Sequence, residues 1–142
     1  MKLQYKINDT DTTIDLDELA DIYSGIVNIG RKCKEVWNTI AIEDDSVDPF
    51  QCQLVGAAGG SWRLKHGQNR TECPKGLLSN KTVPCRSCMG RCVGPNPGRA
   101  KYHQRNPETQ TLLNGKQLSD WGNDINAGDT VSFGNVSVSV ID

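Results

Sequence analysis

The sequence predicts an all-β fold, a β-sandwich of mostly antiparallel strands, and three observations support this prediction. Short runs of alternating or β-branched residues recur, turn signals separate them, and helical periodicity is scarce. The turn signals fall at the spacing expected of a sandwich, at Asp44-Asp45, Gly59-Gly60, Asn114-Gly115 and Ala127-Gly128-Asp129. The runs that we expect to form strands are residues 3–7, 22–29, 39–42, 52–55, 62–64 and 131–141.

The last of these runs is predicted to form a β-hairpin. Apolar residues alternate there with polar ones, and Gly134-Asn135 supplies a two-residue turn of the kind that joins antiparallel strands. Alternation places every second side chain on the same face of a strand. The residues that we expect to be buried on this face are Val131, Phe133, Val136, Val138 and Val140.

Little helix is expected. The best candidate is the segment 16–20, because Asp15 precedes it and can cap a helix with its side-chain oxygen. The segment is short and acidic, so a surface turn explains it equally well.

The chain has 142 residues, enough for one domain with a hydrophobic core, so we expect a single domain over residues 1–142. No segment approaches the roughly 20 apolar residues that span a bilayer, and residues 1–7 lack the apolar stretch of a secretory signal. We therefore expect a cytoplasmic protein with no membrane partner. In that compartment the six cysteines are thiols or metal ligands in preference to disulfides.

The net charge of −1 conceals a segregation of charge along the chain. Residues 1–48 contain 5 cations and 11 acids, whereas residues 72–111 contain 7 cations and 2 acids. The second segment is rich in Pro, Gly, Lys, Arg and Cys and has almost no apolar periodicity. A loop of this length inside a domain is functional, disordered, or held by something other than apolar burial. We therefore predict that residues 72–111 form a Cys-rich insertion within the domain.

Four cysteines of this insertion suggest that a metal ion holds it together. Tetrahedral zinc takes four thiolates, and a Cys-x-x-Cys pair places two of them on one ion. The predicted ligands of one structural zinc, separated by 11, 2 and 3 residues, are Cys73, Cys85, Cys88 and Cys92. Disulfides and free or redox-active thiols remain as alternatives, iron could occupy the same thiolates, and His103 could replace one ligand.

The order of several motifs resembles that of the forkhead-associated (FHA) domain, a β-sandwich that recognises phosphothreonine peptides through loops at one end. The family pattern runs Gly-Arg, a strand, Ser-x-x-His, a strand ending near Asn-Gly, and then Asn-Gly, Gly-Asp and a Phe-Gly hairpin. The match spans residues 22–141, with residues 72–111 as an extra insertion. The matching segments are Ile29-Gly30-Arg31, residues 38–42, Asp45-Ser46-Val47, residues 62–64 with Asn69, residues 113–116, residues 127–129 and Ser132-Phe133-Gly134.

The resemblance implies a phosphate site that is altered in this chain. Arg31 stands at the family's phosphate-binding arginine, whose guanidinium fork suits phosphate oxygens. Asp48 stands at the phosphate-binding serine and would repel a dianion, and Gln51 stands at the histidine that braces this loop. We expect the Asp48 carboxylate to accept the Arg31 donors in place of a phosphate. Asn69 either contacts a peptide or occupies a turn, and Arg70, in place of the expected glycine, adds positive charge.

The resemblance also implies the function. It predicts a protein-interaction (adaptor) module of a Ser/Thr phosphorylation signalling system, with a Ser/Thr kinase or phosphatase as the kind of partner. Such a module binds phosphothreonine peptides or, through a degenerate site, unphosphorylated protein. No motif places a Ser/His/Asp or Cys/His grouping, so we do not expect an enzyme.

A zinc-containing nucleic-acid-binding protein that uses the basic insertion is the alternative. The run 99–105 mixes cations with one aromatic residue, which is typical of proteins that bind single strands. An exposed, solubilising loop explains the same run, and the chain's pI of about 6.1 makes nucleic acid the less favoured partner.

Overall fold

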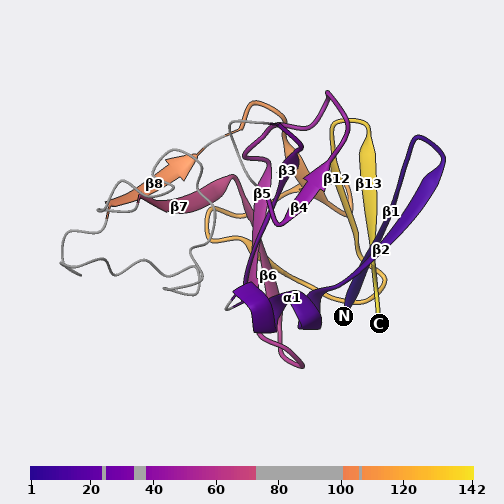
Figure 1. The fold of residues 1–142 in the computed structure, drawn as a ribbon, viewed down its shortest axis with the longest axis horizontal. Coiled ribbons are helices and arrows are strands. Elements are labelled where there is room, and N and C mark those ends of the chain that lie inside the picture. Colours follow the sequence, from indigo (N-terminus) through magenta and orange to yellow (C-terminus); the bar gives the residue numbers. More distant parts are fainter. Residues whose placement is uncertain (24, 34–37, 73–100, 106) are drawn as a thin grey trace.

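The computed structural model describes residues 1–23, 25–33, 38–72, 101–105 and 107–142, with the backbone alone for residues 69–72 and 101–105. It contains two sheets packed face to face and a separate two-stranded ribbon (Figure 1). The fold is thus the β-sandwich that the strand pattern predicts, and among the described residues all strand pairs except one are antiparallel.

The first sheet has six strands and the second has five. The strands of the first, in spatial order, are β10 (Lys116–Gln117), β9 (Thr111–Leu113), β12 (Thr130–Phe133), β13 (Val136–Ile141), β1 (Lys2–Ile7) and β2 (Thr10–Asp15). Those of the second are β11 (Asn123–Ile125), β6 (Trp62–His66), β5 (Cys52–Gly56), β3 (Ile26–Arg31) and β4 (Ile40–Ile42), with β3 and β4 parallel.

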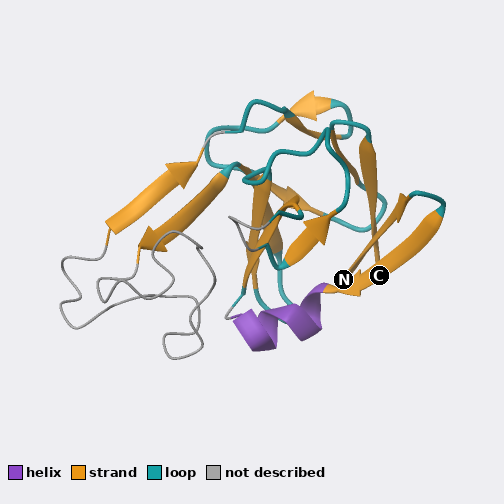
Figure 2. Ribbon diagram, turned by 45° about the horizontal axis from the view of Figure 1, so that its top comes forward, coloured by secondary structure: helices purple, strands orange, loops and turns teal. Residues whose placement is uncertain are grey.

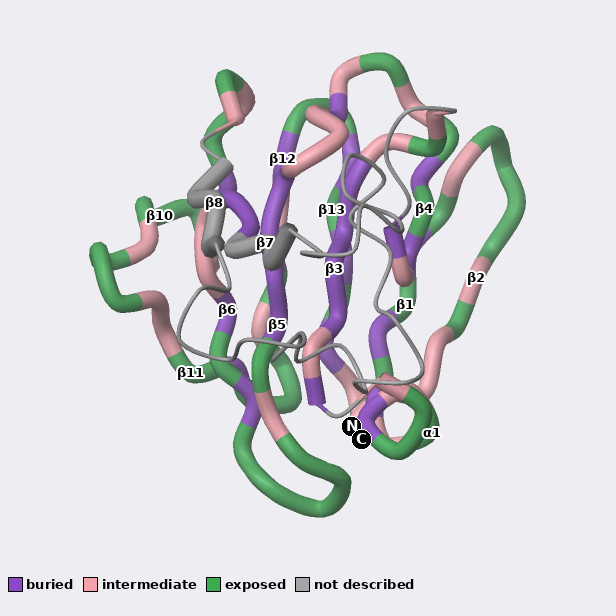
Figure 3. The backbone as a smooth tube through the Cα atoms, turned by 60° about the vertical axis from the view of Figure 1, so that its left-hand side comes forward, coloured by how far each residue is buried: buried purple, intermediate pink, exposed green. Residues whose placement is uncertain are grey.

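The core lies between the two sheets. Buried residues follow the centres of the strands, and exposed ones lie at the turns and the edges (Figure 3). The gap that remains between the facing side chains measures about 10 Å³, no larger than one water molecule. The core is closely packed at this place and leaves no room for a ligand between these side chains.

The predicted C-terminal hairpin is confirmed. Phe133 pairs with Val136 across the Gly134-Asn135 turn, and the pairing continues to Thr130 and Ser139. All five residues predicted to be buried are between 1% and 4% exposed, because alternation points them into the sandwich.

The segment before β3 differs in part from the prediction. Residues 22–29 were expected to form one strand, but the helix α1 (Leu16–Tyr23) includes the first two of them and β3 begins at Ile26. Asp15 caps this helix as expected, since its Oδ1 accepts the Asp17 N–H at 2.9 Å. Gly25 follows the helix with a φ of 76°, and its N–H donates to the Ala20 carbonyl at 3.1 Å.

The β2 strand was not predicted. Asn8 and Asp9 form its hairpin turn with φ angles of 49° and 64°, which asparagine and aspartate tolerate better than other residues. β2 is an edge strand with polar residues on both faces, so it shows no apolar alternation. Pairing with β1 stabilises it instead.

The ribbon consists of β7 (Gln68–Glu72) and β8 (Lys101–Arg105), which pair from Gln68 with Arg105 to Glu72 with Lys101. It projects away from the sandwich (Figure 2). The two chain termini and α1 lie at one end of the sandwich (Figure 1). None of the helices in the described part of the chain has the length and apolar character needed to cross a membrane.

Candidate functional site

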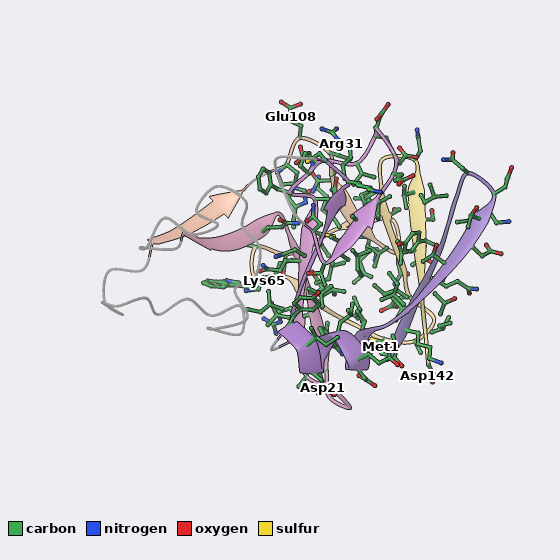
Figure 4. The ribbon with its side chains drawn as sticks, viewed as in Figure 1. Met1, Asp21, Arg31, Lys65, Glu108 and Asp142 are labelled. Atoms are coloured by element: carbon green, nitrogen blue, oxygen red, sulfur yellow. The ribbon has the colours of Figure 1, made fainter. Side chains whose placement is uncertain are left out.

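Three of the predicted site residues, Arg31, Asp48 and Gln51, lie in residues 31–33 and 43–51, and hydrogen bonds connect these segments to residues 107–110. We call the three segments the Arg31 loop cluster. Arg31 and Glu108 both lie at the end of the sandwich opposite Met1 and Asp142 (Figure 4). The first two segments follow β3 and β4, which are neighbours in the sheet, and the third leads into β9 of the other sheet. The loop cluster therefore joins the two layers at one end.

Gly30 explains why the second segment can lie directly on β3. A Cβ atom at this position would be 2.1 Å from the Pro49 carbonyl oxygen, which is backbone and cannot move aside cheaply. The Arg31 N–H then donates to the Asp48 carbonyl at 3.1 Å. The Gly-Arg motif thus fits the close approach of two backbones as well as the position of a cation.

The Arg31 guanidinium is engaged by backbone carbonyls. Its Nη1 donates to the Val47 carbonyl at 3.3 Å and more weakly to the Asp45 carbonyl at 3.5 Å. Among the described residues it has no ion pair. The side chain is half-buried, so it keeps a face toward solvent.

The expected pair between Arg31 and Asp48 is wrong. Asp48 Oδ1 instead accepts the N–H of Phe50 at 2.9 Å, two residues further along the chain. Aspartate commonly closes such a turn with its own side chain, and this local bond competes with a partner on another loop. The acceptors that occupy Arg31 are carbonyls of residues 45 and 47, not the Asp48 carboxylate.

Gln51 lies beneath the loop and is fully buried. Its Oε1 accepts the Asp48 N–H at 3.1 Å, and its Nε2 donates to the Thr109 carbonyl at 2.8 Å and to Thr111 Oγ1 at 2.9 Å. The side chain thus ties the second segment of the loop cluster to the third. Gln51 positions the loop and has no surface with which to touch a ligand.

Asn69 and Arg70 are placed by their backbones alone. Both belong to β7, where they pair with Gln104 and His103 of the ribbon, so Asn69 occupies a strand and not a turn. The four cysteines predicted to bind zinc lie outside the described residues. In the described part of the chain, no cluster of three or more His, Cys, Asp or Glu side chains could hold a metal ion.

A buried polar network next to Arg31 was not predicted. The Gln68 amide donates to the Ile29 carbonyl at 2.9 Å and to Asn38 Oδ1 at 2.8 Å, and Asn38 in turn donates to the Pro49 carbonyl at 2.8 Å. Buried amides need such partners, and here the partners connect β3, β7 and the loop cluster. No periodic signal in the sequence marks these residues.

Ser46 attaches the loop cluster to the C-terminal hairpin. Its Oγ accepts the Asn135 N–H at 2.8 Å and donates to Asp44 Oδ1 at 2.5 Å. The Ser46 hydroxyl and N–H lower the pKa of Asp44, which keeps this carboxylate charged. Thr109 Oγ1 donates to the Ser46 carbonyl at 3.1 Å.

Beside Arg31 lies an open hollow of about 580 Å³. It lies between the first two segments of the loop cluster and the β1–β2 turn, and Asn8, Arg31, Lys32, Cys33, Glu43, Asp44 and Asp45 line it. The Arg31 loop cluster contains five acids and two cations, and Lys32 Nζ is paired with Glu43 at 2.9 Å. The Arg31 loop cluster itself is therefore anionic.

His66 links this end of β6 to β9 and should make folding stability depend on pH. Its Nδ1 lies 3.0 Å from Thr111 Oγ1. Burial lowers the pKa of His66, and this effect outweighs the hydrogen bond with the Pro107 backbone and the charge of Asp48, which both raise it. Below a pH of about 6.5 the unfolded chain therefore binds more protons at this residue than the folded chain. The free energy of unfolding is expected to fall between pH 7.5 and the lower folded pKa.

Urea unfolding from about pH 7.5 to about 5.5 measures this effect. His66→Gln should flatten the dependence. An equal slope in wild type and His66→Gln would contradict the prediction.

The comparisons with known proteins agree with this architecture. No protein-family model matches the chain, and no curated protein sequence matches it either. Among solved structures, the FHA domain of FhaA, complexed with the intracellular domain of Rv3910, is 14% identical with a TM-score of 0.55, and the match covers 97% of this chain and 96% of that chain.

Two further FHA domains give similar values. The domain of CT664 from Chlamydia trachomatis is 10% identical with a TM-score of 0.55, over 99% of this chain and 95% of that chain. The yeast Dun1 domain, in complex with a doubly phosphorylated peptide derived from Rad53 SCD1, is 10% identical with a TM-score of 0.53, over 97% of this chain and 70% of that chain. The chain therefore has an FHA-like β-sandwich fold.

Proposed function

We propose that the chain is a protein-interaction module whose Arg31 loop cluster binds an unphosphorylated, basic segment of a partner protein. The fold supports the first part, since two of the similar FHA domains were solved with a protein domain or a phosphopeptide bound. The anionic loop cluster around a carbonyl-bound Arg31 is the observation on which the second part rests.

The choice between a phosphorylated and an unphosphorylated segment follows from charge. A phosphate dianion beside Arg31 would meet the acids of the cluster, and two like charges at 4 Å repel by about 1 kcal/mol in water and more near a protein surface. It would also have to compete for donors already bound to carbonyls. A lysine or arginine of a partner would not be repelled by these acids and would not compete for the Arg31 donors.

The proposed context is a cytoplasmic Ser/Thr phosphorylation system, with a kinase or phosphatase as the partner and no catalysis by this chain. The resemblance of the motif order to that of FHA domains supports this context. We assign the positioning of the loop to the fully buried Gln51, and contact with the partner to Arg31 and Asp48, which are both half-buried.

A peptide library with a central threonine, offered with and without phosphate, tests the proposal. Wild type is expected to select basic flanks and to gain nothing from the phosphate. Asp48→Ser removes one negative charge near Arg31 and should improve phosphothreonine binding by about 1 kcal/mol, roughly five-fold. Adding Arg31→Ala should abolish that gain.

Asp21→Ser is the matched control, because it makes the same charge change at the opposite end of the sandwich (Figure 4). It should leave peptide binding unchanged. Tight, Arg31-dependent phosphothreonine binding by wild type would overturn the choice of an unphosphorylated segment but not the interaction module itself.

We also propose that Cys73, Cys85, Cys88 and Cys92 hold one structural zinc. Four thiolates in a basic segment are a complete ligand set for this ion. The ribbon supports the proposal, since the pairing of Glu72 with Lys101 brings together the two ends of the segment that contains all four cysteines. A closed loop of that kind is well suited to a metal cross-link.

A further inference from the structure

Among the described strands of the two sheets, β2 offers the longest open edge. It has six residues and ends the six-stranded sheet, whereas the other three end strands, β10, β11 and β4, have three residues or fewer. Figure 3 shows β2 at the side of the sandwich, with exposed and half-buried residues along it. An edge of this length presents backbone groups with which a further strand can pair.

The turn before β2 decides which of its backbone groups point outward. Asn8 and Asp9 form a two-residue turn with positive φ angles, so the flanking Ile7 and Thr10 exchange both of their backbone hydrogen bonds. Along an antiparallel pair such bonds occur at every second residue, so the N–H and C=O groups of the residues between them point away from β1. In β2 these outward residues are Asp11, Thr13 and Asp15.

β2 lacks the features that commonly prevent an edge from pairing. Proteins block edge strands with prolines, bulges and lysines. β2 contains no proline, glycine or lysine, and its register with β1 runs without a bulge from Asp15 to Thr10. Ile14 packs against the core and holds the strand in the sheet. The outer edge of β2 is therefore a regular template for another strand.

The acids beside this edge disfavour a second copy of the chain as the added strand. Residues 8–17 contain four acids and no cation, and the acids are Asp9, Asp11, Asp15 and Asp17. A two-fold pairing centred on Thr13 would place each Asp11 opposite Asp15 of the other copy, and like charges directly opposite each other destabilise a sheet. Shifting the register by one step in either direction brings Asp9 or Asp17 opposite another of these acids.

The cations of the hairpin do not cancel this charge. Lys2 and Lys6 lie on β1, one strand further from the edge, and residues 1–17 contain four acids against these two cations. Lys6 reaches Asp11 at 3.9 Å, but both side chains are more than half exposed, so the pair is weak. The edge therefore favours a strand that carries positive charge.

The open edge also begins beside the Arg31 loop cluster. Asn8, in the turn before β2, lines the same hollow as Arg31, Asp44 and Asp45. The loop cluster is anionic as well, with five acids and two cations. A basic segment that enters the hollow can thus continue along β2 without a change in the sign of the charge that it meets.

We propose that β2 binds an extended, basic segment of the partner protein as an added strand. The backbone of the segment pairs with the outward groups of β2, and lysines or arginines lie beside Asp11 and Asp15. These two acids are four residues apart in a strand, so the segment carries cations at the same spacing. The inference rests on the proposed function, because the same segment also enters the hollow beside Arg31.

Titration calorimetry with a nine-residue peptide tests the proposal, with lysine at its first, fifth and ninth positions and valine or threonine between them. Thr13→Pro removes an outward N–H, which an edge strand tolerates, and should weaken binding about ten-fold. Thr13→Val keeps this N–H and is the matched control, so its affinity should equal that of wild type. Amide exchange measured by NMR should slow at Asp11, Thr13 and Asp15 when the peptide binds.

Two further measurements do not depend on the fold of the Thr13→Pro protein. A peptide N-methylated at alternate residues keeps its charges but loses the donors on one edge, and it should bind wild type about ten-fold more weakly. Asp11→Asn should weaken binding of the original peptide roughly three-fold. Asp124→Asn, the same change on the β11 edge, is the matched control and should have no effect.

The outcomes separate the added strand from the loop cluster. Binding that depends on Asp45, tested as Asp45→Asn, but not on Thr13 or on the peptide N–H groups would overturn the added strand and leave the proposed function intact. Binding that depends on Thr13 but not on Asp45 would support the strand and contradict the loop cluster as the binding site. No peptide binding, or a dimer of the chain that Thr13→Pro abolishes, would overturn the choice of a basic partner segment.

Discussion

Zinc removal is expected to disorder residues 73–100 of the Cys-rich insertion while the sandwich stays folded. Structural zinc contributes on the order of 10 kcal/mol to the folding of small metal domains, and the insertion has almost no apolar periodicity with which to replace it. The sandwich has its own closely packed core between the two sheets. Loss of the metal should therefore affect the insertion and leave the sandwich folded.

Elemental analysis of protein purified without added metal should give about one zinc per chain. Hydrogen exchange before and after chelation should then show faster exchange in peptides from residues 73–100 and unchanged protection in β12 and β13. Cys85→Ser should lose the zinc, whereas Cys33→Ser, outside the cluster, should keep it. Less than about 0.2 metal per chain, together with disulfides among the four cysteines, would contradict the proposal.

Each strand that the sequence predicts has at least two buried apolar residues. The inward residues of β12 and β13 alternate with serines, so the buried positions can be recognised in the sequence from this alternation. β2 and β10 lie at sheet edges, and their polar residues show no such alternation. Ile22 misled the prediction because an apolar residue at the end of α1, 47% exposed, looked like the start of β3.

The order of the motifs predicted some residues of the site but not the residues to which they are hydrogen-bonded. Arg31 and Gln51 were located by resemblance, and the bracing position of Gln51 agrees with its buried hydrogen bonds. Thr109 and Thr111, which receive those bonds, lie 58 and 60 residues further along the chain, within the predicted insertion. A contact across such a distance has no periodicity by which to recognise it.

The pair between Arg31 and Asp48 failed for a different reason. Motif order identifies which residues lie near each other but not which hydrogen bonds they choose. Asp48 precedes Pro49, and its carboxylate reaches the Phe50 N–H within the same turn. A local bond of this kind does not require a second loop to be ordered, so it costs less conformational entropy than the longer-range ion pair and forms in its place.

Replacement of Gln51 by leucine is expected to have the largest effect of any single substitution in the loop cluster. Leucine fills a similar volume, but it leaves the Asp48 N–H and the Thr109 carbonyl without the hydrogen bonds that Gln51 makes to them. Each buried group left unsatisfied costs about 1–3 kcal/mol, so the free energy of unfolding should fall by about 3 kcal/mol. Urea unfolding, with circular dichroism at low denaturant to verify the fold, measures the change.

Two further variants decide whether the hydrogen bonds are the cause. Gln117→Leu makes the same chemical change at an exposed position of β10 and should stay within about 0.5 kcal/mol of wild type. Gln51→His restores one donor and one acceptor, so it should recover part of the loss. A Gln51→Leu protein as stable as wild type would mean that the second and third segments of the Arg31 loop cluster are held together by packing instead, and the bracing role of Gln51 would then have to be abandoned.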